Sequence, residues 1–169
     1  MAPIRAFVPP LVLACLITAC KHGPDGAPID DALYRMALDQ EGHVWYGFSD
    51  ALLPKSAGSG HGEPLLRTRY NDVAATLLDS MGKVLPDTVF PVGALVVKEL
   101  WENDGTIGTY AVLFKKPSEP AADADGWVWG YFTGDGEVRV TALDQGAACR
   151  TCHGQPGHID RTLMNIYFP

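Results

Sequence analysis

The feature that most constrains this chain is a Cys-x-x-Cys-His motif near the C-terminus, at Cys149, Cys152 and His153. This spacing is the attachment motif of a c-type haem. Two thiols so placed can add to the vinyl groups along one porphyrin edge, and the histidine that follows lies beneath the ring, where it can bind the iron. The motif therefore predicts haem c as the cofactor, held covalently by Cys149 and Cys152, with His153 as an axial iron ligand.

Two other sites use a Cys-x-x-Cys pair. A zinc ribbon needs a second pair of ligands, and the chain has no second pair of this kind. A thioredoxin-like redox motif would open a helix early in a βαβ unit, whereas this motif follows a run of predicted strands. Haem attachment is therefore the favoured interpretation.

The N-terminus has the pattern of a bacterial export signal. Arg5 precedes an almost wholly apolar run, residues 6–19, which is too short to cross a bilayer. The ending Ile-Thr-Ala-Cys20 resembles a lipobox, which predicts cleavage before Cys20 and lipidation of that cysteine; Cys15 is a competing site that would halve the apolar run. Lys21 after the cysteine resembles outer-membrane sorting, so we expect a lipid-anchored protein facing the periplasm, on the outer rather than the inner membrane.

These predictions divide the chain into a signal peptide (1–19), a lipid-anchored linker (20–29) and a single haem-binding domain (30–169). Without residues 1–19 the chain carries 12 basic and 20 acidic residues, a net charge of −8. Such an acidic chain is not expected to bind nucleic acid. With Cys20 lipidated, both thiols of the haem motif stay free of structural disulfides.

The hydrophobic patterning predicts an α+β fold: an antiparallel β-meander with a few helices and a covalently bound haem on one face. Asn103-Asp104-Gly105 and Gly134-Asp135-Gly136 mark two hairpins. A long irregular segment, 44–64, is expected to be a binding loop or lid. The expected helices cover 32–40, 73–81 and the haem motif, with a turn near 160; the expected strands cover 65–70, 94–101, 107–115, 126–132 and 137–142.

Lys98 and Glu99 are the two charged residues in the otherwise apolar strand 94–101. Because neighbouring side chains of a strand point to opposite faces, one of the two charges should point toward the core. An unpaired buried charge is costly, so that residue should be paired, neutralised or bonded to another group. The alternative is a side chain that reaches solvent at the strand end.

Other side chains offer a second axial ligand. His22, His43, His61 and His158 are each more simply explained as satisfied surface residues, and Met36 and Met81 as helix packing. Met164, or else His158, is the candidate sixth ligand if the protein is an electron carrier. Trp127, Trp129 and Tyr131 alternate on one strand face, as expected of a sheet core that can also form a haem wall.

The chain resembles the cytochrome P-460 family, which includes the cytochromes c′-beta. The resemblance covers about residues 30–169. The segments that carry it, in the family's order, are His61-Gly62, Arg69-Tyr70-Asn71-Asp72-Val73-Ala74, Gly93-Ala94-Leu95-Val96-Val97-Lys98-Glu99, Gly126-Trp127-Val128-Trp129, and Cys149-x-x-Cys152-His153 with Asp160 downstream.

This resemblance implies a sheet domain with a five-coordinate haem whose distal side is open. Catalytic members have a lysine cross-linked to the porphyrin and oxidise hydroxylamine, which makes Lys98 the cross-link candidate. They also use a distal carboxylate as proton acceptor; Glu119, Asp123 and Asp125 are the candidates here. Arg69 could orient that acid, although a surface charge is the simpler explanation.

We therefore expect an exported monohaem oxidoreductase that oxidises hydroxylamine or a related small nitrogen compound and passes electrons to a periplasmic protein. Two alternatives stay open. A binder of nitric oxide or another diatomic gas, like the cytochromes c′-beta, would lack the cross-link, and a six-coordinate cytochrome c would carry electrons only. Dimers are common in the resembled family, so a homodimer is one expectation.

Overall fold

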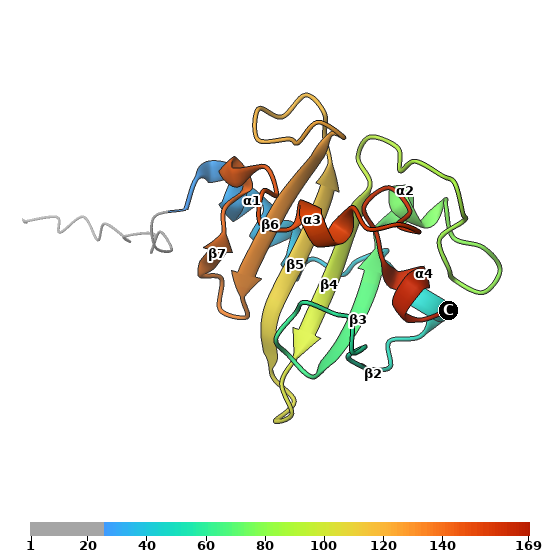
Figure 1. Ribbon diagram of the computed structural model, residues 1–169. Coiled ribbons are helices and arrows are strands. Elements are labelled where there is room, and N and C mark those ends of the chain that lie inside the picture. Colours follow the sequence, from blue (N-terminus) through green and yellow to red (C-terminus); the bar gives the residue numbers. More distant parts are fainter. Residues whose placement is uncertain (1–25) are drawn as a thin grey trace, which may run out of the picture.

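The computed structural model describes residues 26–169, so the predicted signal peptide, Cys20 and most of the linker lie outside the described residues. The fold is α+β, as predicted, with an open seven-stranded antiparallel sheet (Figure 1). The order of the strands is β1-β3-β4-β5-β6-β7, and β2 also pairs with β3. None of the helices within 26–169 is long and apolar enough to cross a membrane.

The strands are β1 (Val44–Trp45), β2 (Leu53–Pro54), β3 (Leu65–Tyr70), β4 (Leu95–Trp101), β5 (Ile107–Lys115), β6 (Trp127–Thr133) and β7 (Val138–Val140). The helices are α1 (Pro28–Leu38), α2 (Asp72–Ala75), α3 (Arg150–His153) and α4 (Met164–Tyr167), with 3-10 turns η1 (Tyr46–Phe48) and η2 (Ala142–Asp144). The predicted bounds of β3 and β5 are confirmed.

The two predicted helices outside the haem motif have different bounds in the structure. α1 begins at Pro28, because proline suits the first turn of a helix and the Asp30 carboxylate accepts a hydrogen bond from the Ala27 amide. α2 is much shorter than the predicted 73–81. The Asn71 side chain caps it at the Ala74 amide, and a bridge between Leu78 and Val84 then diverts the chain.

The sheet is covered on both faces. α1 packs on one face, where Leu33 and Ala37 join a core with Val97 and Val112. The C-terminal segment, residues 142–169, crosses the other face with α3 and α4, so segments from opposite ends of the chain sandwich the sheet (Figure 1). The predicted haem motif thus lies on the face opposite α1.

Candidate haem site

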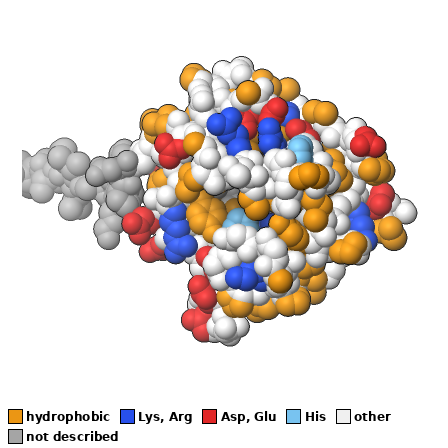
Figure 2. All heavy atoms as spheres, viewed as in Figure 1, with side chains coloured by type: hydrophobic (Ala, Val, Ile, Leu, Met, Phe, Trp, Pro, Cys, Tyr) orange, Lys and Arg blue, Asp and Glu red, His pale blue; other side chains and the backbone are white. Residues whose placement is uncertain are grey.

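A hollow lies between the sheet and the C-terminal segment. It consists of two adjoining spaces of about 60 and 250 Å³, both lined by His61, Lys98, Tyr131, Cys149 and His153. The walls of the smaller space are mainly apolar side chains, including Val96, Leu113, Trp129, Leu163 and Met164. Figure 2 shows histidine and lysine or arginine atoms recessed among hydrophobic side chains near the centre of this face.

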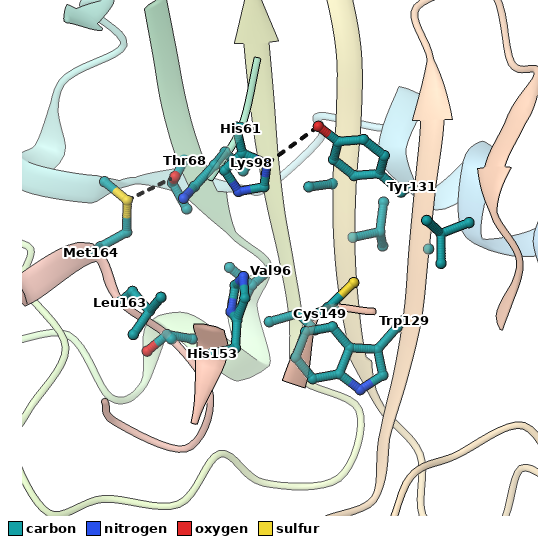
Figure 3. Close-up of a pocket in the computed structure, with 16 residues that line it drawn as sticks. His61, Thr68, Val96, Lys98, Trp129, Tyr131, Cys149, His153, Leu163 and Met164 are labelled. Carbon is teal, nitrogen blue, oxygen red and sulfur yellow. Dashed lines mark hydrogen bonds between the residues drawn. The ribbon is translucent and has the colours of Figure 1, made fainter. Parts of the chain in front are cut away.

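His153 points from α3 into the hollow, as a haem ligand should (Figure 3). Its Nδ1 donates to the backbone carbonyl of Arg161 at 2.7 Å, so Nε2 keeps the free lone pair. The ring also packs edge-on against Trp129, with 5.2 Å between ring centroids. Desolvation lowers the pKa of His153 to about 4, so the imidazole is neutral and able to bind a metal at pH 7.

The carbonyl that holds His153 belongs to a constrained loop. Asp160 and Arg161 both have positive φ angles, 40° and 73°. The Asp160 carboxylate fixes this loop to the sheet, since it accepts hydrogen bonds from Lys115 Nζ at 2.9 Å and from Trp127 Nε1 at 3.1 Å. This role of Asp160 could not be predicted from the sequence, because only the tertiary structure brings it to Lys115.

Cys149 and Cys152 are free thiols at the rim of the hollow, Cys149 half-buried and Cys152 exposed. Both line the larger space. Burial raises the pKa of the Cys149 thiol. The thiols and His153 therefore border one space, as the attachment motif requires.

Lys98 points into the same hollow from β4. Desolvation lowers its pKa to about 8, and its ammonium has no hydrogen-bond or ion-pair partner within residues 26–169. Glu99 points to the opposite face, where it is fully buried and pairs with Arg67 and Arg69. Glu99 is therefore sealed from solvent together with its ion-pair partners, whereas Lys98 is half-buried in the hollow and has no such partner within residues 26–169.

His61 and Tyr131 form the wall of the hollow that faces His153 (Figure 3). The Tyr131 hydroxyl lies 3.3 Å from His61 Nδ1, and the two rings are stacked with 5.7 Å between centroids. The His61 and His153 ring centroids are only 6.4 Å apart. Desolvation, followed by the charge of Lys98, lowers the pKa of His61 to about 3. From the sequence, His61 was interpreted as a surface residue, like the other histidines outside the haem motif.

The three predicted distal acids are not among the residues that line the hollow. Glu119 pairs with Lys116. Asp123 accepts hydrogen bonds from the amide of Trp127 and the indole of Trp129, so it orders the turn before β6. Asp125 is exposed and pairs with Arg161. Their placement gives no support to a proton-accepting role.

Arg69 lies on the far side of the sheet from the hollow. Its guanidinium is completely buried, where it pairs with Glu99 and donates to the carbonyl of Ala37. A surface charge, the simpler sequence explanation, is therefore wrong, and Arg69 does not reach the hollow to orient an acid. The reason is strand alternation: Thr68, not Arg69, faces the hollow.

Glu63 is a carboxylate near the site that the sequence analysis missed. It is buried, accepts a hydrogen bond from the Thr109 hydroxyl and pairs with Arg139 at 3.5 Å through Oε1, while Oε2 has no hydrogen-bond partner within residues 26–169. Desolvation, followed by the charge of Glu63, raises the pKa of Tyr131 to about 12. The only sequence signal was its position directly after His61-Gly62.

The two predicted sixth ligands of an electron carrier differ in placement. Met164 lines the hollow, with its sulfur accepting a hydrogen bond from the Thr68 hydroxyl at 3.2 Å. His158 does not line it, and its Nδ1 accepts from the Arg161 amide at 3.1 Å. Of these two, only Met164 is at the hollow.

The donor set of the hollow fits a haem better than a bare metal ion. Within residues 26–169 no group of three or more His, Cys, Asp or Glu side chains could hold a metal ion. Imidazoles on two facing walls instead suit an iron whose equatorial donors come from a porphyrin, and the apolar walls suit the ring itself. No family model matches the chain, and no curated protein matches it either.

Proposed function

We propose that this chain is an exported c-type haem protein of the cytochrome P-460 type, which oxidises hydroxylamine or a related small nitrogen compound. The observation that carries the proposal is the convergence of Lys98, His153 and the two motif thiols on one hollow. These residues come from β4 and from the C-terminal segment, 51 or more positions away along the chain.

Each residue has a stated part in this proposal. Cys149 and Cys152 hold the haem by thioether bonds, and His153 binds the iron through Nε2 while the Arg161 carbonyl fixes its ring. The bound haem supplies an iron that accepts electrons from the substrate and passes them to a periplasmic protein. Lys98 would be the residue that bonds the porphyrin; this is supported by its position in the hollow, where it has no ion-pair partner within residues 26–169.

A specific observation also favours the gas-binding alternative. No carboxylate is among the residues that line either space of the hollow. Without a carboxylate at the wall, proton removal from a bound hydroxylamine would fall to a nitrogen base such as the neutral imidazole of His61. A protein that binds nitric oxide needs no proton acceptor, so this function is the second candidate.

The first experiment tests haem attachment. The protein should be produced in a host that matures c-type cytochromes, and the expected product carries haem that survives acid-acetone extraction and denaturing gels. The Cys149→Ala, Cys152→Ala double variant should lose this haem. Covalent haem retained in the double variant, or absent from the wild type, would contradict the proposal.

The matched assay then separates the two candidate functions. Hydroxylamine-dependent reduction of an artificial electron acceptor supports the enzyme. Nitric oxide binding without any such turnover supports the gas binder. Asp144→Asn, which changes an exposed carboxylate away from the hollow, should leave both readouts unchanged.

A further inference from the structure

We propose that His61 is a second axial ligand of the iron that His153 binds, and that small ligands open the site by displacing it. This inference rests on the proposed haem attachment. It departs from the five-coordinate site that the family resemblance implies. The segment 44–64 would then supply His61, the ligand that occupies the second axial position of the iron until a small molecule displaces it.

The first support is the relation of the two imidazoles. Their ring centroids are 6.4 Å apart across the hollow, with 76° between the ring planes (Figure 3). Two imidazoles that share one metal ion, each bonded at about 2 Å, place their ring centres about 6 Å apart. Any angle between the planes is compatible with such a pair, because both planes contain the ligand axis.

The second support is the hydrogen bonding behind each ring. A ligating histidine characteristically donates its other ring nitrogen to a neighbouring acceptor. His153 does so to the Arg161 carbonyl at 2.7 Å, and His61 Nδ1 has the Tyr131 hydroxyl oxygen at 3.3 Å. When Nδ1 of each ring donates, Nε2 of each ring is the free donor atom. The Arg161 carbonyl requires this tautomer of His153, and the Tyr131 hydroxyl, which can donate or accept, permits it for His61.

The third support is the open space around the two glycines beside His61. His61 lies between Gly60 and Gly62, and neither glycine has any atom of another residue within 4 Å of its Cβ position. The backbone carbonyls of His61 and Gly62 are tied by Lys55 Nζ, at 2.9 and 3.2 Å. Displacement of His61 would therefore meet no packed side chain at either glycine, and it would cost the two Lys55 contacts and the ring contact with Tyr131.

Two other donors compete for the same position. The Lys98 amine lines both spaces, and the Met164 sulfur lines the smaller one. The Met164 sulfur already accepts the Thr68 hydroxyl, whereas the Lys98 amine has no polar partner within residues 26–169 to orient it. His61 alone among the three combines a free donor nitrogen with a hydrogen bond that fixes its direction.

The test is the spin state of the iron in the haem-loaded protein. The ferric wild type should be low-spin by electron paramagnetic resonance and absorption, and His61→Ala should be high-spin. Added imidazole should restore the low-spin spectrum of His61→Ala, since it supplies the missing ligand. Cyanide should bind at least about ten times faster to His61→Ala than to the wild type, because no protein ligand has to leave.

Matched variants identify the ligand. His43→Ala changes a histidine outside the hollow and should stay low-spin. Tyr131→Phe removes the group behind His61 and should give a mixture of spin states, which provides a readout if His61→Ala does not fold. A low-spin spectrum that survives in His61→Ala, or that is lost in Met164→Leu or Lys98→Arg instead, would overturn the proposal.

The outcomes separate this inference from the proposed function. Covalent haem with a high-spin wild-type spectrum refutes the His61 ligand and leaves haem attachment intact. A low-spin wild type whose spectrum neither nitric oxide nor cyanide changes refutes the displacement. Absence of covalent haem refutes the proposed function itself, and the inference falls with it.

Discussion

At the scale of single residues, Lys98 is the side chain on which the choice of function depends. Its amine lines the hollow without a partner, and desolvation lowers its pKa to about 8. A lysine with a lowered pKa has a larger fraction of neutral amine, the form that can make a covalent bond. Lys98 therefore has the location for a porphyrin cross-link; forming the bond would replace a porphyrin C–H by C–N with loss of two protons and two electrons, so it would also need a two-electron oxidant such as a peroxide.

Lys98→Arg tests that bond. In the wild type, tryptic cleavage after Lys98 should be blocked, and the intact mass of the haem peptide should include the Lys98 segment together with the Cys149 and Cys152 peptides. Lys98→Arg retains a positive charge but should hold haem through the thiols alone, with hydroxylamine oxidation reduced at least tenfold and nitric oxide binding retained. A wild-type haem peptide without the Lys98 segment would exclude the cross-link.

The pKa of Lys98 also predicts a pH dependence in the haem-free protein. The folded state releases the proton near pH 8, while an unfolded lysine holds it to about 10.5, so the unfolded state binds more protons in between. The contribution of Lys98 to stability therefore improves as the pH rises from 8 toward 10. Urea unfolding should show Lys98→Met more stable than wild type at pH 7, by a margin that shrinks at pH 9.5. A constant margin would contradict the assigned burial.

At the scale of secondary structure elements, β3 and β4 are joined by a buried ion-pair cluster on the face opposite the hollow. Register pairs Arg67 directly with Glu99, and the Glu99 carboxylate also accepts from Arg69 and from the Trp101 indole at 3.2 Å. The Arg67 guanidinium lies 4.3 Å from the centroid of the Trp45 ring. One carboxylate thus pairs with two guanidinium groups.

Glu99→Ala should destabilise the fold by about 3–5 kcal/mol, because it leaves the Arg69 guanidinium buried without its ion-pair partner. Denaturant unfolding measures the change. Glu137→Ala, at an exposed position, is the matched control and should change the stability by no more than about 0.5 kcal/mol. Equal effects of the two substitutions would show that the cluster contributes little.

The elements also show what the sequence can and cannot predict. The meander was predictable because its signals are local in the sequence. They are the alternation of apolar and polar residues around Val138 and Val140 and the turn residues Asn103-Asp104-Gly105. The predicted length of the second helix was wrong because the Leu78–Val84 bridge competes with the helix. A contact between separate positions leaves no periodic signal in the sequence. The motif located His153, but His61 and Glu63 reach the site through a loop whose path is set by tertiary contacts.

At the scale of the whole molecule, the middle of the sheet is the most enclosed part. β4 pairs with β3 and β5, β5 pairs with β4 and β6, and both faces of this region are covered. Amides held in such strands open only with global unfolding. The short C-terminal helices, in contrast, pack from one side only.

Hydrogen exchange should follow this arrangement. In the haem-free double cysteine variant, amides of Val97 and Val112 should exchange most slowly, at the rate of global unfolding. Amides of residues 150–158 should exchange orders of magnitude faster, because this segment lies over the hollow with few buried side chains. Exchange measured by mass spectrometry gives both rates, and uniform protection along the chain would contradict the prediction.

Lys98 and Glu99 are adjacent in β4 and point to opposite faces of the sheet, so one face carries an ammonium group in the hollow and the other a carboxylate paired with two arginines. A slip of one residue in the β3–β4 register would carry an anion into the hollow and bring an ammonium group among two guanidinium groups. Such a mispaired sheet would suffer a charge conflict on each face at once. The two adjacent charges therefore disfavour the shifted pairing relative to the native register.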